Sequence, residues 1–198
     1  MTSVTCLRAA SYRRVPWRNG GGITAEIAVA PMAATVAGGF DWRLSCAEVS
    51  VSGPFSEFAG YDRTIVQLSG TPMRLVSGDK SISLQLGQPH AFAGEDAVYG
   101  VVDDPVQDFN CIVRRGRYST QIESLLLDPR SNSERQLAAP VVAIFVAEGS
   151  VKVWFEQASS DLLSGDTLLI EGDEAKKLSL HAATSESRVL VVSLVQAR

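Results

Sequence analysis

Glycines recur at one spacing in the two halves of this chain, and they constrain its fold more than any other feature. Three pairs share an offset of 78 or 79 residues: Gly70 and Gly149, Gly87 and Gly165, Gly94 and Gly172. Random placement rarely gives three glycine pairs nearly the same offset. Repetition on this scale predicts two copies of one structural unit in tandem.

Short runs of β-branched and aromatic residues fill the intervals between these glycines. Runs of this length, separated by Gly, Pro and Asp clusters, are typical of antiparallel sandwiches and barrels. The expected strands are 42–51, 64–68, 72–76, 81–86, 97–102, 109–113, 141–146, 151–155, 167–170, 178–181 and 189–195. Helical periodicity is weak everywhere, and the best candidates are 123–127 and the stretch before Pro140. The sequence predicts an all-β fold.

The repeat also predicts the domain boundaries. A first β-barrel unit over residues 1–120 would be followed by a second over residues 121–198. The segment 117–140 is rich in Ser, Arg, Asn and Pro between Asp128 and Glu134, which is typical of a connection. We therefore expect two barrels packed into one body.

Composition excludes several classes of partner. The chain of 198 residues carries a formal charge of −4, whereas nucleic acids and anionic membranes require a basic surface. The longest apolar run, 141–147, is far too short to span a bilayer, and we expect no secretory signal, because the amino end lacks the apolar segment of one. Three cysteines without paired spacing indicate buried thiols in a reducing compartment. We expect a cytoplasmic protein that binds neither nucleic acid nor membrane.

Three consecutive glycines, Gly20, Gly21 and Gly22, open a strand near the amino end. After them apolar residues alternate with polar ones, so Thr24 and Glu26 share one strand face. The stretch lacks the Gly-Lys-Ser/Thr ending of a phosphate loop. Glycine permits close backbone approach, so we expect a crowded rim of β-structure here.

Four blocks of the first 115 residues resemble the HutD/Ves family: 15–27, 42–47, 53–63 and 108–115. The Gly165-Asp166 corner and the hairpin at Gly149 resemble cupin barrels. The resemblance implies a fold of two cupin barrels and an association with bacterial histidine utilisation. It also implies binding or buffering of an intermediate such as urocanate or formylglutamate.

A metal site is not expected. Cupin metal sites use two closely spaced histidines, a carboxylate and a third histidine. This chain has only His90 and His181, 91 residues apart. We expect no metal and no other cofactor.

The remaining candidates for ligand binding leave alternatives open. His90 is a possible hydrogen-bonding group or proton shuttle, or else a half-exposed structural histidine. Glu26 faces either a cavity or the solvent. Arg43, which shares a strand face with Ser45, and Arg114 are candidate carboxylate clamps, because a guanidinium makes two parallel hydrogen bonds. Arg63 is a candidate partner for Glu26, but the favoured interpretation is an Asp62-Arg63 ion pair that fixes the turn at Gly60.

Aromatic residues offer the apolar part of a site. Phe55 and Phe58 lie among small residues and form either a wall for a flat ligand or part of the core. The predicted set of ligand-binding residues is Trp17, Asn19, Gly20, Gly21, Gly22, Thr24, Glu26, Arg43, Ser45, Phe58, His90 and Arg114.

These observations predict a metal-independent protein that binds a small carboxylate in the first barrel and acts as a regulator or buffer. The alternative is a metal-free isomerase, lyase or hydrolase in which Glu26 and His90 act as an acid–base pair. A homodimer is a further expectation, since such barrels often pair through sheet edges.

Overall fold

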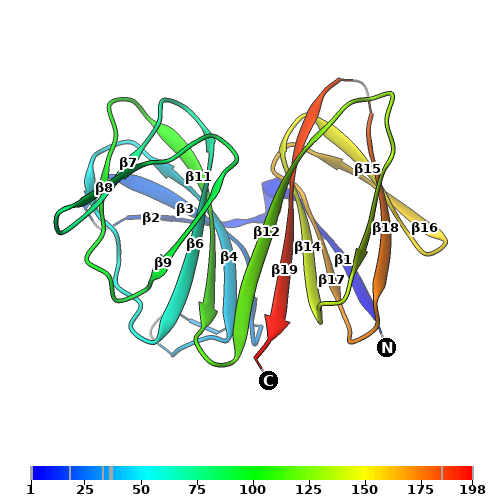
Figure 1. Ribbon diagram of the computed structural model, residues 1–198, viewed down its shortest axis with the longest axis horizontal. Helices are drawn as coiled ribbons and strands as arrows, with labels where there is room; N and C mark the ends of the chain where they lie inside the picture. Colours follow the sequence, from blue (N-terminus) through cyan, green and yellow to red (C-terminus); the bar gives the residue numbers. More distant parts are fainter. Residues whose placement is uncertain (1, 18, 33, 36–37, 184, 198) are drawn as a thin grey trace. The chain divides into compact units, whose positions relative to one another are not determined.

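The computed structural model describes residues 2–17, 19–32, 34–35, 38–183 and 185–197. Strands predominate, and the described residues contain one short 3₁₀ helix, η1 (Ala9–Ser11), but no α-helix (Figure 1). Alternation of apolar and polar residues underlies this outcome, because a period of two places one set of side chains on a buried face. The predicted all-β class is confirmed.

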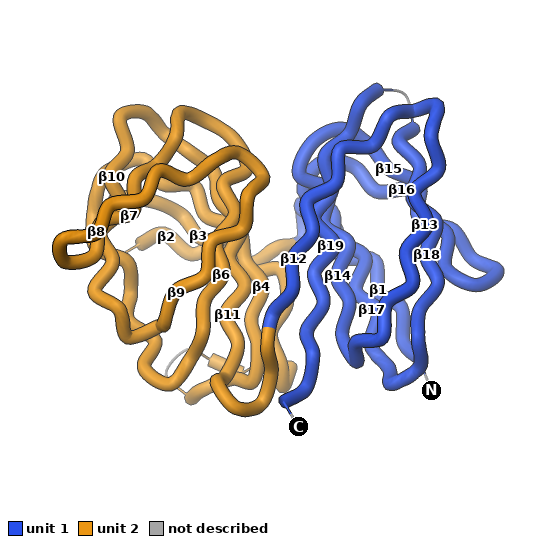
Figure 2. The backbone as a smooth tube through the Cα atoms, in the orientation of Figure 1, with its two compact units in different colours: residues 1–11, 120–198 blue, residues 12–119 orange. Residues whose placement is uncertain are grey.

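The chain divides into two compact units (Figure 2). The central unit comprises residues 12–119, and the terminal unit comprises residues 1–11 and 120–198. Strand β1 (Ser3–Leu7) explains the difference from the expected boundaries, because it pairs antiparallel with β17 (Thr167–Glu171). The first eleven residues therefore belong to the terminal unit.

Two antiparallel sheets build the central unit. The larger has the order β2-β3-β4-β11-β6-β9, with β2 (Arg13–Pro16), β3 (Gly22–Ala30), β4 (Trp42–Val49), β11 (Val106–Arg114), β6 (Tyr61–Ser69) and β9 (Pro89–Ala93). The smaller has the order β5-β10-β7-β8, with β5 (Gly53–Pro54), β10 (Tyr99–Val101), β7 (Arg74–Ser77) and β8 (Lys80–Ser83).

The terminal unit also contains two sheets. One has the order β1-β17-β14-β19-β12, with β14 (Val141–Glu148), β19 (Ser187–Gln196) and β12 (Tyr118–Leu127). The other has the order β13-β18-β15-β16, with β13 (Ser133–Leu137), β18 (Lys176–Ala182), β15 (Ser150–Phe155) and β16 (Ala158–Leu163). Strands β12 and β13 occupy the segment expected to be a connection. Residues 123–127, a helix candidate, lie within β12, so that assignment was wrong.

The strand orders of the two units reveal the repeat. The order β9-β6-β11-β4 in the central unit matches β17-β14-β19-β12 in the terminal unit, and β5-β10-β7-β8 matches β13-β18-β15-β16. Gly70 and Gly149 follow the equivalent strands β6 and β14, each with a positive φ. The strand pairings of each unit form open sheets rather than a continuous ring among the described residues. Strands β2 and β3 have no counterpart in the terminal unit.

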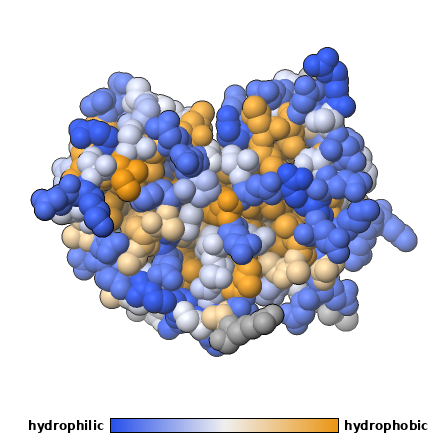
Figure 3. All heavy atoms as spheres, viewed as in Figure 1, coloured by the Kyte–Doolittle hydropathy of each residue, from blue (hydrophilic) through white to orange (hydrophobic). Residues whose placement is uncertain are grey.

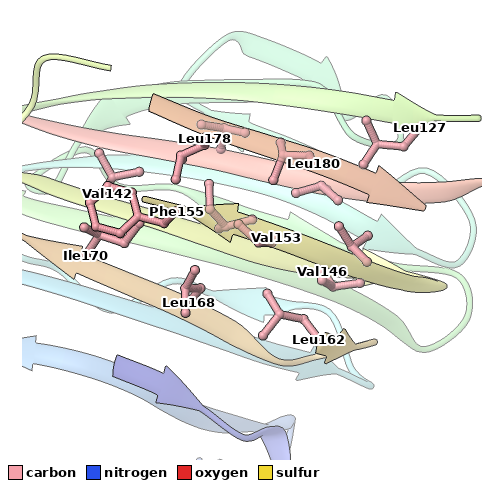
Figure 4. Close-up of a cluster of buried hydrophobic side chains, with 14 of the residues drawn as sticks. Leu127, Val142, Val146, Val153, Phe155, Leu162, Leu168, Ile170, Leu178 and Leu180 are labelled. Atoms are coloured by element: carbon pink, nitrogen blue, oxygen red, sulfur yellow. The ribbon is translucent and has the colours of Figure 1, made fainter. Parts of the chain in front are cut away.

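Apolar side chains from both sheets meet inside each unit. In the terminal unit, Val142 and Val146 of β14 pack with Val153 of β15 and Leu180 of β18 (Figure 4). In the central unit the core includes Ile65, Met73, Leu75 and Val98. The face drawn in Figure 3 exposes mostly hydrophilic residues at its outer margins, with apolar residues among them. No helix of the described residues is long and apolar enough to cross a membrane.

Candidate functional site

The central unit contains a cavity of about 740 Å³. One face of the six-stranded sheet, the segment 54–58 and the residues Trp17, Asn19 and Thr35 line it. Its lining consists of Arg13, Val15, Pro16, Trp17, Asn19, Thr24, Thr35, Arg43, Ser45, Ala47, Pro54, Phe55, Ser56, Glu57, Phe58, Arg63, Asn110 and Ile112. Volumes in this range suit small-molecule ligands.

Strand register brings the polar residues of this lining together. Glu26 pairs with Ser45, which in turn pairs with Asn110. One row further along, Arg43 pairs with Ile112, which pairs with Arg63. Directly paired residues project from the same face of a sheet. Polar side chains from four strands therefore point into one space.

Two arginines hold the carboxylate of Glu26. Arg43 donates from Nε to Oε2 at 2.8 Å, and Arg13 donates from Nη2 to Oε1 at 2.8 Å. Burial opposes ionisation of Glu26, but these two hydrogen bonds outweigh it and lower the pKa of the carboxyl. The carboxylate is thus an anchor that fixes the two guanidinium groups beside the cavity.

Arg63 forms the deepest cationic group of the site. Arg63 is only 5% exposed. Its Nη1 donates to the Ser56 carbonyl at 3.0 Å, and its Nη2 donates to Asn110 Oδ1 at 2.9 Å. Its guanidinium carbon lies 5.0 Å from the centre of the Phe55 ring and 5.4 Å from that of Phe58. Burial lowers the pKa of Arg63 to about 10, and the charge of Arg43 acts in the same direction. The group nevertheless stays cationic at neutral pH.

Asn110 connects Arg63 to a buried carboxyl. Its Nδ2 donates to Asp108 Oδ1, while its Oδ1 accepts from Arg63. Asp108 is fully buried, and burial raises its pKa to about 7, although Asn110 and the charge of Arg63 oppose this. Arg63 Nε and Asp108 Oδ2 are buried atoms without a hydrogen-bond partner among the described residues. Buried polar atoms of this kind require an explanation.

Trp17 is locked against the wall of the cavity. Its indole nitrogen donates to Thr24 Oγ1 at 2.8 Å, and its ring packs on Gly22. A Cβ at position 22 would lie 2.4 Å from the Glu48 carbonyl oxygen and 3.1 Å from the Trp17 ring. Glycine is therefore required here for the close approach, as the sequence predicts.

The other two glycines shape the turn and do not line the cavity. Gly20 has a φ of 70° and its N–H donates to the Trp17 carbonyl, while the N–H of Gly21 donates to Asn19 Oδ1 at 3.0 Å. These two N–H groups are used within the loop, although both glycines belong to the predicted set of ligand-binding residues. The Asn19 side chain instead reaches the lining.

Donors exceed free acceptors around the cavity. No described residue accepts from the terminal nitrogens of Arg43 or from Nδ2 of Asn19, and Arg63 Nε is likewise unpartnered. The carboxylate of Glu26 is already shared by two arginines, and Glu57 is exposed. The arrangement can accept an anion or another ligand rich in hydrogen-bond acceptors.

Of the residues predicted from the sequence, six line the cavity: Trp17, Asn19, Thr24, Arg43, Ser45 and Phe58. Glu26 lies directly behind two of the lining arginines. Gly20, Gly21 and Gly22 form the adjacent turn. His90 and Arg114 do not line the cavity.

Arg114 is directed elsewhere. Its Nε donates to the Phe40 carbonyl at 3.1 Å and lies 3.4 Å from Asp41 Oδ1, and its guanidinium lies over the Tyr61 ring. These contacts stabilise residues 40 and 41, which directly precede β4.

His90 lies on β9, where it pairs with Ile65 and stacks near Phe92. Glu26 lies on β3, four strands away in the same sheet, so about 19 Å of sheet separates the two backbones. His90 is also absent from the cavity lining, so the structure gives no support to an acid–base pair of Glu26 and His90. The other histidine, His181, belongs to the terminal unit, and the described residues contain no group of three or more potential ligands for a metal ion.

The interpretation of Asp62 and Arg63 as an ion pair is corrected. Asp62 accepts from Arg115 Nε at 2.8 Å, whereas Arg63 projects into the cavity. Neighbouring residues of a strand face opposite sides of the sheet, so this parity was available as a signal. Sequence reasoning also left out Arg13, whose strand partner is Glu26.

The fold and the site together define a protein with two cupin-like units and a donor-rich cavity in the central one. A cupin 2 conserved barrel domain protein from Leptotrichia buccalis is similar in fold alone, with a TM-score of 0.58 at 9% identity over 92% of this chain and 96% of that chain. The HutD family model matches residues 9–189, so the chain belongs to the HutD family.

Individual relatives agree with this assignment. An uncharacterised 21.2 kDa protein from the hutC 3′ region of Pseudomonas putida is 36% identical, over 88% of this chain and 90% of the relative. Protein Ves of Escherichia fergusonii is 37% identical, but over 52% of this chain and 55% of Ves. A formate-condition structure of HutD from Pseudomonas fluorescens SBW25 has a TM-score of 0.83 at 33% identity, covering 98% of this chain and 99% of that chain.

Proposed function

We propose that the protein binds a small carboxylate metabolite in the cavity of the central unit, without a metal ion. The observation that carries this proposal is the excess of hydrogen-bond donors around the cavity. Arg43 and Arg63 approach it from the same sheet face with unused N–H groups, and Asn19 adds an amide. A guanidinium binds a carboxylate through charge-assisted hydrogen bonds, which are stronger than neutral ones.

Aromatic side chains extend the proposal to a ligand with a flat or apolar part. Trp17, Phe55 and Phe58 line the same cavity as the arginines. Since Phe55 and Phe58 also flank Arg63, they exclude water from its guanidinium and strengthen its interaction with an anion.

The comparison with relatives supports a link to histidine utilisation, since one of them is encoded in a hutC 3′ region. We therefore propose urocanate or formylglutamate, both of which are carboxylates, as ligands. The protein would buffer or sense such an intermediate in the cytoplasm. The homodimer stays a prediction, which sedimentation analysis of the purified protein tests.

Isothermal titration calorimetry with urocanate and with formylglutamate tests the function. We expect saturable binding of at least one compound. Replacing Asn19 by Ala should weaken binding, and Arg43→Gln should weaken it further. Arg74→Gln is the matched control, because Arg74 is an exposed arginine on β7 that does not line the cavity. If neither compound binds at millimolar concentration, the proposed ligand class is rejected.

A further inference from the structure

We propose that occupation of the cavity by a carboxylate is coupled to protonation of Asp108, through Asn110 and Arg63. This inference rests on the proposed function and adds a regulation of the same site. It makes binding sensitive to pH near neutrality.

The geometry provides a direct path from the cavity to Asp108. Arg63 and Asn110 line the cavity, and Asp108 lies behind them with no exposed surface. The Asn110 amide bridges the two charged groups, because it accepts from Arg63 and donates to Asp108. Arg63 and Asp108 are thus separated by one amide group, and all three residues are buried, so their charges interact more strongly than they would in water.

No other described residue offers Asp108 a compensating charge. Asp108 lies on β11, and its partners on the neighbouring strands are Ala47 of β4 and Gln67 of β6. The Gln67 amide is used on backbone groups at Thr71 and Met73. The buried core cluster of the central unit, which includes Met73, Leu75 and Val98, consists of uncharged residues.

Cys46, on β4, is the other titratable group near Asp108. Burial and the charge of Asp108 both raise the pKa of this thiol, so it stays neutral and offers no counter-charge. The charge on Asp108 therefore depends on Arg63 alone among the described groups.

A bound anion alters this balance. Without ligand, the positive charge of Arg63 holds part of the Asp108 population ionised, and burial places the pKa of Asp108 at about 7. An anion against Arg63 neutralises that field and adds a negative charge of its own. Both effects favour the protonated form of Asp108, and the proton has a position on Oδ2, which lacks a partner among the described residues.

The sign of the coupling follows from linkage. A group whose pKa is higher in the complex takes up a proton on binding, so affinity declines as pH rises above its pKa in the free protein. One coupled proton gives a decline of at most about tenfold per pH unit. We expect this decline between pH 7 and pH 9. Glu26 does not contribute, because its pKa is lowered and it stays ionised throughout this range.

Carbon-13 NMR of the wild-type protein, labelled at the aspartate carboxyl carbons, tests the coupling directly. We expect the Asp108 titration midpoint to rise by about one pH unit or more with saturating formylglutamate. Formylglutamate has no group that titrates between pH 6 and pH 9, so the shift is attributable to the protein. Acetate is a second probe, small enough to reach Arg63, and it should raise the midpoint even if neither metabolite binds. An unchanged midpoint with acetate and with every metabolite that binds overturns the inference.

Calorimetry in HEPES and in Tris at pH 7.5 measures the proton uptake independently, since the two buffers differ in ionisation enthalpy. The wild type should take up a fraction of a proton per ligand. Asp108→Asn should take up none, and its affinity should be independent of pH from 7 to 9. His90→Gln should retain the uptake. Proton uptake by Asp108→Asn equal to that of the wild type would contradict the coupling. If neither metabolite binds, the proposed function is rejected. The acetate titration then decides whether the coupling exists.

Discussion

Glu26 and Arg43 meet across the neighbouring strands β3 and β4, with Arg43 Nε 2.8 Å from Glu26 Oε2 and only 12% of each side chain exposed. The pair is held in place by Arg13, which binds the other carboxylate oxygen. An ion pair with this little exposure leaves an uncompensated charge when one partner is removed.

Glu26→Gln should therefore lower the free energy of unfolding by about 1–2 kcal/mol at pH 7, less than the loss from a fully buried pair. The pKa of Glu26 is lowered from its ordinary value of 4.5. Its contribution to stability is therefore complete above pH 4.5 and is lost as pH falls through the lower pKa of the folded state. Urea unfolding from pH 7 to pH 2.5 measures this. The difference between wild type and variant should shrink on acidification; a constant difference would argue against the ionic origin.

Gly22→Ala should destabilise the central unit by about 1–3 kcal/mol, because the new Cβ collides with backbone and with the Trp17 ring. The contact with the Glu48 carbonyl would be 2.4 Å. Thermal unfolding followed by tryptophan fluorescence reports both stability and the surroundings of Trp17. Gly53→Ala is the matched control, since its nearest contact would be an ordinary 3.6 Å. Equal effects of the two substitutions would contradict the proposed crowding at Gly22.

Lys176→Met should destabilise the terminal unit by about 1–3 kcal/mol, since it leaves buried carbonyls without donors. The residue Lys176 is only 1% exposed, and its ammonium group donates to the carbonyls of Ala139, Gly172 and Glu174. Chemical unfolding measures the loss. The neighbouring Lys177→Met removes a side chain that is 76% exposed, and its effect should stay within about 0.5 kcal/mol. An unchanged free energy of unfolding for Lys176→Met would contradict this prediction, because the three carbonyls would then need no ammonium donor.

Asp166→Ala should release the amino-terminal segment from the terminal unit. The carboxylate accepts from the backbone N–H groups of Ala9 and Leu163 and from Arg8 Nη1. Hydrogen exchange should show lost protection in residues 3–11, together with a loss of about 1–3 kcal/mol in stability. Asp161→Ala, at a side chain 72% exposed, should leave this protection intact. Persistent protection of residues 3–11 in Asp166→Ala would mean that strand pairing alone holds β1.

Much of the fold was readable because glycine spacing and strand alternation are local properties. The structure places Gly70 and Gly149 at equivalent turns, as the sequence repeat predicts. The misassigned segment 117–140 shows the limit. Positions along the first part of strand β12 alternate between intermediate and exposed, but only Leu127 is buried, so its sequence carries little of the apolar signal that marks a core strand. Pairing with β19, which is distant in sequence, makes it a strand.

The site was predictable in part for the same reason. Alternation correctly placed Arg43 beside Ser45 and Thr24 beside Glu26, because each pair lies on one strand. Register between strands decides which distant residues meet, and the sequence does not state it. Arg63 faces the cavity only because β6 pairs with β11, whereas His90 lies one strand beyond it.

The pairing of β1 with β17 has a consequence for biosynthesis. Arg8 and Asp166 are 158 residues apart, so at about 5–20 residues per second the ribosome needs about 8–30 s to deliver the partner of the amino-terminal strand. The uninterrupted segment 12–119 can complete its own sheets during that interval. Nascent chains should therefore complete the cavity of the central unit before the first strand of the polypeptide pairs with β17.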